Sequence, residues 1–144
     1  KLCFLARRLS IMASELRVNT LKDASGNNSI ATSFVAGGSA KAWCGYDQTS
    51  TPSIDDSLNV ASLTDTATGR TFVNYSSNMN NAGYSVSLAV AKWDATDDGN
   101  STCAIGSTSV VRTTSGHPSA HSRGDNNLLL DTANICSTVH GDLA

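Results

Sequence analysis

The chain has 144 residues, a formal net charge of −2 and charged residues at only 15% of its positions. This length suits one domain with a single hydrophobic core, and so weak a charge gives no basic field to attract the phosphates of nucleic acid. No run approaches the roughly 18 consecutive apolar residues of a membrane helix. We therefore expect neither nucleic-acid binding nor membrane insertion.

The first eleven residues, KLCFLARRLSI, precede Met12, and Met-Ala-Ser-Glu has the look of a natural start. A secretory signal places its charges before roughly 7 to 15 apolar residues, whereas here only residues 2–6 precede Arg7 and Arg8. We expect residues 1–11 to derive from read-through of an upstream segment or from an unusual start site. Their predicted form is a short amphipathic arm.

An extended segment is predicted over residues 15–21, and a cluster of turn-forming residues at 23–26 ends it. The apolar residues of this segment are Leu16, Val18 and Leu21. The following stretch, residues 27–38, is irregular and is interpreted as a connector. The predicted organisation is an N-terminal arm and connector over residues 1–37 and a β-sandwich domain over residues 38–144.

Residues 40–90 have the alternation of apolar and polar positions that is typical of strands. In the first strand Ala42, Cys44 and Tyr46 face one way, and Trp43 faces the other. The plainest alternation is in Tyr84–Val90, so one face of that strand is expected in the core. The predicted strands are Ala40–Tyr46, an edge piece at Ile54–Asp56, Leu58–Leu63, Arg70–Tyr75 and Tyr84–Val90.

The C-terminal half is predicted to contain two loops and three strands. The loops are Asp94–Thr102 and the long polar stretch Thr113–Asn127; the strands are Cys103–Arg112, Leu128–Leu130 and Ile135–Val139. Short strands about ten residues apart, separated by turn formers, indicate an all-β fold, an antiparallel, jelly-roll-like β-sandwich. No segment shows sustained helical periodicity.

Two groups of residues resemble metal sites. His117 and His121 share a face only on a helix, which Gly116 and Pro118 disfavour, so we interpret them as solvated loop histidines. Oxygen-bearing side chains between residues 94 and 100 resemble a loose calcium loop, but the EF-hand spacing and its terminal Glu are absent, which favours an ordinary acidic turn. They are Asp94, Asp97, Asp98 and Asn100. No metal and no cofactor is expected.

The sequence contains no catalytic motif: no serine stands in a G-x-S-x-G elbow, and the carboxylates lie on predicted turns instead of facing one cleft as in a glycan hydrolase. We therefore expect no enzyme. The tripeptide Arg123-Gly-Asp125 is interpreted as chance turn chemistry.

The aromatic residues allow two interpretations. On a shared exposed face they could stack on sugar rings, as in carbohydrate-binding surfaces, and otherwise they pack in the core. Core packing is favoured for Trp43 and Tyr84 because of their strand context. The aromatic residues considered are Trp43, Tyr46, Tyr75, Tyr84 and Trp93.

The four cysteines stand far apart, with no C-x-x-C pair and no zinc-ligand spacing. Buried free thiols are the favoured interpretation, because cysteine is often a small core residue. A disulfide would be long-range, such as Cys44 with Cys103 or Cys136. The fourth cysteine is Cys3.

Four motifs between residues 38 and 84 occur in the order seen in a module of tailed-bacteriophage fibres, which this part of the chain resembles. They are Gly38-Ser-Ala-Lys-Ala-Trp43, Ile54-Asp-Asp-Ser-Leu-Asn-Val60-Ala-Ser-Leu-Thr-Asp65, Gly69-Arg-Thr-Phe-Val-Asn74 and Ala82-Gly-Tyr84. The chain end, Val139–Ala144, is similar to the ends of such proteins in marine phages. The sequence departs from the family at Cys44, where an apolar residue is usual.

The resemblance implies a virion protein located in a tail fibre or on the capsid surface, and a homotrimer whose residues Leu16, Val18 and Leu21 associate near the axis. Other virion proteins and a host surface glycan are the expected partners. The residues expected to face a receptor are Trp93, Asn100, His117, His121 and Arg123. Two alternatives are a capsid decoration or head-fibre protein, whose arm docks on capsid subunits, and a stand-alone carbohydrate-binding module.

Overall fold

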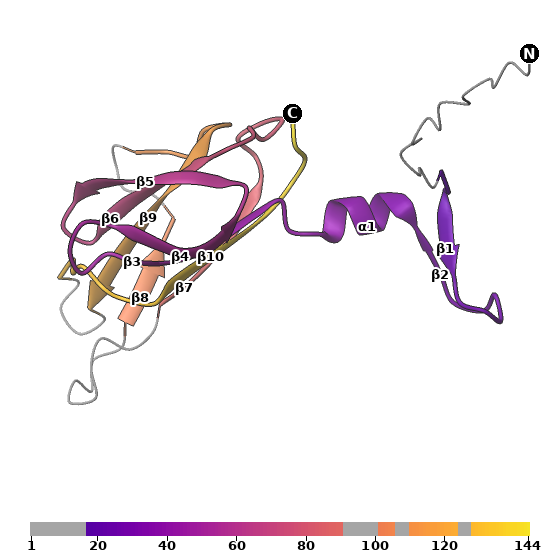
Figure 1. The fold of residues 1–144 in the computed structure, drawn as a ribbon, viewed down its shortest axis with the longest axis horizontal. Coiled ribbons are helices and arrows are strands. Elements are labelled where there is room, and N and C mark those ends of the chain that lie inside the picture. The colour runs from indigo at the N-terminus through magenta and orange to yellow at the C-terminus, as the bar shows by residue number, and fades with distance from the viewer. Residues whose placement is uncertain (1–16, 91–100, 106–109, 124–127) are drawn as a thin grey trace, which may run out of the picture. The chain divides into compact units, whose positions relative to one another are not determined.

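The computed structural model describes residues 17–90, 101–105, 110–123 and 128–144. The chain divides into two compact units, residues 1–35 and residues 36–144. The described residues form ten strands and one short helix (Figure 1). No helix among them has the length and apolar character needed to cross a membrane.

The described part of the N-terminal unit contains a two-stranded antiparallel ribbon of β1 (Thr20–Lys22) and β2 (Ser29–Ala31), in which Leu21 lies opposite Ile30. The Asp23 carboxylate organises the turn, because it accepts hydrogen bonds from Asn28 Nδ2 at 2.7 Å and from the Asn27 amide at 3.0 Å. Two strands alone are marginally stable. The ribbon therefore depends on its turn and on what packs against it.

Helix α1 (Thr32–Gly38) follows β2 and spans the boundary between the two units. The sequence predicted an irregular connector over residues 27–38, and the structure instead places β2 and α1 there. Seven residues are too few to produce a helical periodicity that sequence reading can detect. No residue of α1 is buried.

The second unit is a sandwich of two four-stranded sheets, which confirms the predicted antiparallel β-sandwich (Figure 1). The first sheet contains, in spatial order, β4 (Ser53–Leu58), β3 (Ala42–Asp47), β10 (Ile135–His140) and β7 (Ser85–Val90). The second contains β5 (Val60–Ala67), β6 (Arg70–Tyr75), β9 (Gly116–Arg123) and β8 (Ser101–Ala104). All these strand pairs are antiparallel.

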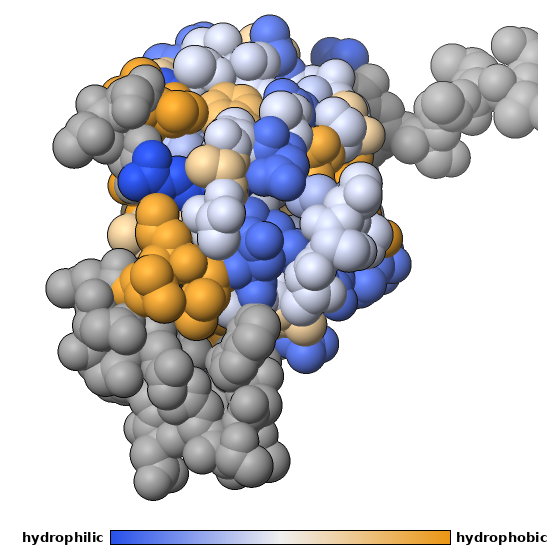
Figure 2. Space-filling view, turned by 90° about the vertical axis from the view of Figure 1, so that its left-hand side faces the viewer, coloured by the Kyte–Doolittle hydropathy of each residue, from blue (hydrophilic) through white to orange (hydrophobic). Residues whose placement is uncertain are grey.

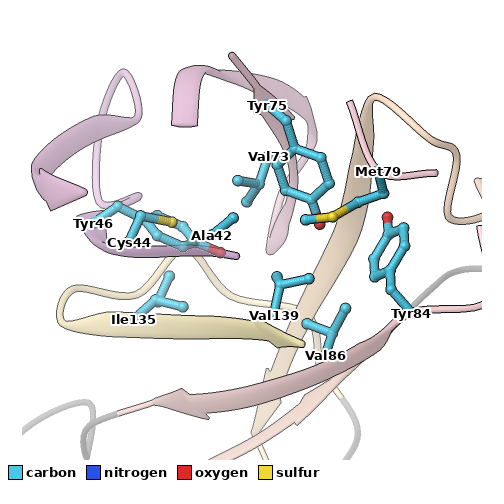
Figure 3. Packing of buried hydrophobic residues seen from close by; sticks show 10 residues of the cluster. All are labelled: Ala42, Cys44, Tyr46, Val73, Tyr75, Met79, Tyr84, Val86, Ile135 and Val139. Atoms are coloured by element: carbon cyan, nitrogen blue, oxygen red, sulfur yellow. The ribbon is translucent and has the colours of Figure 1, made fainter. Parts of the chain in front are cut away.

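The core lies between the two sheets and follows from strand alternation. Ala42, Cys44 and Tyr46 point inward from β3, as predicted, and meet Val73 from the second sheet (Figure 3). The other buried hydrophobic residues are Tyr75, Met79, Tyr84, Val86, Ile135 and Val139. Three tyrosines in so small a core bring hydroxyl groups inside, and these require partners.

The predicted loop over Thr113–Asn127 is wrong, because Gly116–Arg123 is the strand β9, which lies inside the second sheet between β6 and β8. This strand was not recognised from the sequence because it consists of glycine, proline, alanine and polar residues. Strands usually carry β-branched and aromatic residues. The predicted strands around this segment were also inaccurate. Strand β8 covers only Ser101–Ala104, and of Leu128–Leu130 only Leu129 makes an isolated bridge, to Ser122.

A left-handed residue separates the two sheets where the sequence predicted one strand over Leu58–Leu63. Asn59 has φ 56°, and its side-chain oxygen accepts a hydrogen bond from the Ser77 amide at 2.7 Å. Asparagine tolerates this conformation better than most residues. The chain thus leaves β4 in the first sheet and enters β5 in the second.

Candidate functional site

The described residues of the N-terminal unit expose their larger apolar side chains. Val18 and Leu21 were predicted to associate, and they are exposed; the third predicted residue, Leu16, lies outside the described residues. Sequence reading did not select Ile30, Phe34 and Val35, which are exposed in the same unit. The exposed fractions of these five side chains range from 38% for Val18 to 73% for Phe34. The ribbon and helix therefore present an uncovered apolar surface, which we call the N-terminal apolar surface.

His117 and His121 are fully buried, so their prediction as solvated, receptor-facing loop residues is wrong. Both side chains point from β9 into the space between the sheets, because residues at even spacing share one face of a strand. The Nδ1 atom of His117 lies 2.8 Å from the hydroxyl of Tyr75. The Nε2 atom of His121 lies 3.3 Å from both Tyr46 Oη and Ser119 Oγ.

Burial keeps both histidines neutral. Removal from water disfavours the charged imidazolium and lowers the pKa of His117 and of His121 to about 4. The carboxylate of Asp131 acts in the opposite direction on His121, but desolvation is the larger effect. A second ring nitrogen of each histidine, His117 Nε2 and His121 Nδ1, is buried without a hydrogen-bond partner. Among the described residues, no group of three or more His, Cys, Asp or Glu side chains could hold a metal ion.

Several other predicted site residues fall outside the described part of the chain. Residues 91–100 contain Trp93, Asp94, Asp97, Asp98 and Asn100. Arg123 is the last residue of β9, and the structure does not describe its side chain. The calcium-type loop and the receptor-facing roles of these residues remain predictions.

Trp43 lies on the outer face of the first sheet, so its predicted core packing is wrong. In β3 the buried residues alternate with partly buried ones, and Trp43 belongs to the second set. The register places Leu58 opposite Trp43 on one side and Thr138 on the other. Core packing of Tyr84 is confirmed, because its buried hydroxyl donates to the Gly116 carbonyl at 2.6 Å.

A hollow of about 380 Å³ opens at the end of β7 and β10. It is bordered by polar side chains and glycines, namely Gly37, Asn81, Gly83, Tyr84, Ser85, His140, Gly141 and Asp142. His140 and Ser85 are opposite each other in the β10–β7 pair and alternate with the inward-facing Val139 and Val86. The hollow therefore adjoins the outer face that carries Trp43. Sequence reading missed it because turns around residues 81 and 141 bring its residues together.

The rest of the visible surface has mixed polarity. Figure 2 shows one face of the molecule on which hydrophilic residues are common and hydrophobic residues gather in smaller patches.

Among the described cysteines, Cys44 is buried, Cys103 is partly buried and Cys136 is exposed, and all three are free thiols. The predicted buried free thiol is thus confirmed for Cys44, and Cys136 differs because it faces outward from β10.

Comparison with known proteins assigns no family to this chain. No family model, no curated protein and no solved structure matches it. We therefore infer function from the sequence motifs, the N-terminal apolar surface and the outer face of the first sheet.

Proposed function

We propose that the chain is a structural protein of a bacteriophage particle, a trimeric module of a tail fibre or surface appendage that acts in assembly and host attachment. The four motifs between Gly38 and Tyr84 support the virion assignment, because their order resembles that of fibre modules. An antiparallel sandwich suits this role, since it holds binding residues on a rigid scaffold. The proposal is for binding and assembly without catalysis.

The N-terminal apolar surface carries the proposal. Its two-stranded ribbon has too few strands for stability on its own, yet Leu21, Ile30 and Phe34 remain exposed to water. Association of identical copies around an axis would place these side chains against one another and remove them from water. The resemblance to fibre modules favours three copies.

Residues 17–35 carry little charge that would oppose this association. Among the described residues of the N-terminal unit, ionisable side chains are limited to Arg17, Lys22 and Asp23. So few charges produce only weak repulsion between copies of residues 17–35 at physiological salt. In this segment hydrophobic burial is therefore the dominant contribution to the proposed assembly.

Imaging of labelled particles tests the virion assignment. A label on the C-terminal residue should appear on tail fibres or on a surface appendage of the particle. Label at regular capsid lattice points would favour the head-decoration alternative, in which residues 17–35 dock on capsid subunits. Absence of the chain from purified particles would overturn the proposal.

A further inference from the structure

One row of side chains crosses the outer face of the first sheet. The register places Leu58, Trp43, Thr138 and Ser87 side by side on β4, β3, β10 and β7. Leu58 and Ser87 are exposed, and Trp43 and Thr138 are partly buried. Trp43 therefore lies on a central strand of this face, with an apolar neighbour on one side and hydroxyl groups on the other.

Open space adjoins Trp43 along its own strand. The next residue on the same face is Gly45, and a Cβ atom placed there would meet no atom within 4 Å. Asp56 and Cys136 lie opposite Gly45 in the neighbouring strands, and both are exposed. The surface beside the indole is thus unobstructed and is bordered by a carboxylate.

The hollow at the end of β7 and β10 continues this face. Thr138 and His140 are successive outward residues of β10, separated by about 7 Å along the strand. Beyond them the hollow supplies hydrogen-bonding groups from Asn81, Ser85 and Asp142. The polar hollow therefore begins on the same face as Trp43, one outward residue beyond its cross-strand neighbour Thr138.

This arrangement matches the chemistry of a neutral saccharide. A pyranose ring has a face of C–H groups, which packs on an aromatic π surface, and a rim of hydroxyl groups, which pair with carboxylate, amide and imidazole atoms. Lys41 lies between Trp43 and the hollow, but its ammonium group already donates to the Ala36 carbonyl and the Ser39 hydroxyl. None of the described residues that border the hollow is Lys or Arg, and Asp142 would repel an anionic sugar. We infer that the outer face of the first sheet binds a neutral oligosaccharide, with one ring over Trp43 and the next in the hollow. The inference rests on the proposed attachment role and names its ligand class and site.

An array of neutral oligosaccharides containing glucose, galactose and mannose, together with sialylated counterparts, tests the site with the full chain. The best neutral ligand is then titrated against variants by calorimetry. Trp43→Ala and Asp142→Asn should each weaken binding by roughly tenfold. The control is Phe72→Ala, since Phe72 is also partly buried but belongs to the opposite sheet, and this variant should bind like the unmodified chain.

The second variant keeps the test decisive if Trp43→Ala unfolds, because Asp142 is exposed and its replacement disturbs no packing. Failure of the unmodified chain to bind any neutral oligosaccharide would overturn the inference, and so would unchanged affinity in both variants. The results that would refute the glycan site differ from those that would refute the proposed function. A trimer that binds no glycan refutes this inference alone, and a monomer that binds glycans refutes trimeric assembly alone.

Discussion

The hydroxyl of Tyr75 on β6 lies 2.8 Å from Nδ1 of His117 on β9, and both side chains are buried between the sheets. A parallel arrangement joins Tyr46 of the first sheet to Ser119 and His121 of the second, with the Tyr46 and Ser119 oxygens 2.6 Å apart. The core of this sandwich therefore combines hydrophobic packing with specific polar contacts. Such contacts stabilise one arrangement of strands over others only while every partner is present.

Replacement of Tyr75 by Phe tests that polar contact. The change removes only the hydroxyl and leaves His117 with both ring nitrogens buried and unpartnered, because Nε2 already lacks a partner. We expect the free energy of unfolding to fall by about 1–3 kcal/mol. Urea unfolding followed by circular dichroism measures the change.

The matched variant replaces both partners. Tyr75→Phe combined with His117→Phe removes the polar pair as a whole, and the double variant should lose less stability than the sum of the two single variants. A Tyr75→Phe variant as stable as the unmodified chain would contradict the hydrogen bond between Tyr75 and His117.

Stability should fall in mild acid. The unfolded chain protonates its histidines near pH 6.5, whereas His117 and His121 in the folded chain do so only near pH 4. The unfolded state thus binds more protons between these values, and the free energy of unfolding decreases as pH drops through this window. The expected loss is on the order of 2 kcal/mol for each histidine. Urea unfolding at about pH 7 and about pH 4.5 measures it.

Two variants assign this loss. His121→Gln should remove about half of the pH dependence, and so should His117→Gln. Asp23 and Asp47 do not account for the loss of stability between pH 7 and pH 4.5. Hydrogen bonds lower the pKa of each carboxyl below 3.8, so the stability that these groups contribute is lost at lower pH. Equal stability at the two pH values would contradict burial of the neutral histidines.

Alternation was the part of the fold that the sequence could predict. In β3 and β7 hydrophobic residues recur at every second position, and these two strands, like β6 and β10, were found near their predicted bounds. Strand β9 could not be recognised, because its inward residues are His117, Ser119 and His121. Their burial depends on tyrosine hydroxyls from β3 and β6, and such long-range pairing has no local signature.

The candidate site likewise contains some residues that the sequence indicated and others that it did not. Sequence reading selected Val18 and Leu21 because an apolar segment before a domain is visible locally. It placed Trp43 on the opposite face from Ala42 and still predicted core packing for it, whereas only the Ala42 face of β3 is buried. Asn81 and Asp142 were not predicted, because only the tertiary structure brings them to the same hollow.

Two glycines should respond differently to a methyl group. In Gly116→Ala the new Cβ would overlap the carbonyl oxygen of Val73 and the ring of Phe72, so β9 would have to move from β6. We expect destabilisation of about 2–3 kcal/mol. Gly45→Ala, in a central strand of the other sheet, has open space and should change stability by less than about 1 kcal/mol. Thermal unfolding of both variants measures the difference, and a Gly116→Ala variant as stable as Gly45→Ala would contradict the packing.

The thiols should react at different rates in the folded chain. Cys136 is exposed, whereas Cys44 is buried with its Sγ atom 3.3 Å from Ser137 Oγ, and burial raises the pKa of the Cys44 thiol. Since the thiolate is the reactive form, we expect iodoacetamide to label Cys136 in the folded chain and Cys44 only after unfolding. Peptide mass spectrometry identifies the labelled residues. Rapid labelling of Cys44 under native conditions would contradict the position of β3 in the core.

The solution mass of the chain and of one double variant tests the central proposal most directly. Light scattering should give three times the chain mass of 14.9 kDa for the unmodified protein. Leu21→Ser combined with Ile30→Ser should give the mass of one chain, whereas Val111→Ser, at an exposed valine of the sandwich unit, should remain a trimer. An unmodified chain that is monomeric at working concentration, or a double variant that stays trimeric, would contradict assembly through the N-terminal apolar surface.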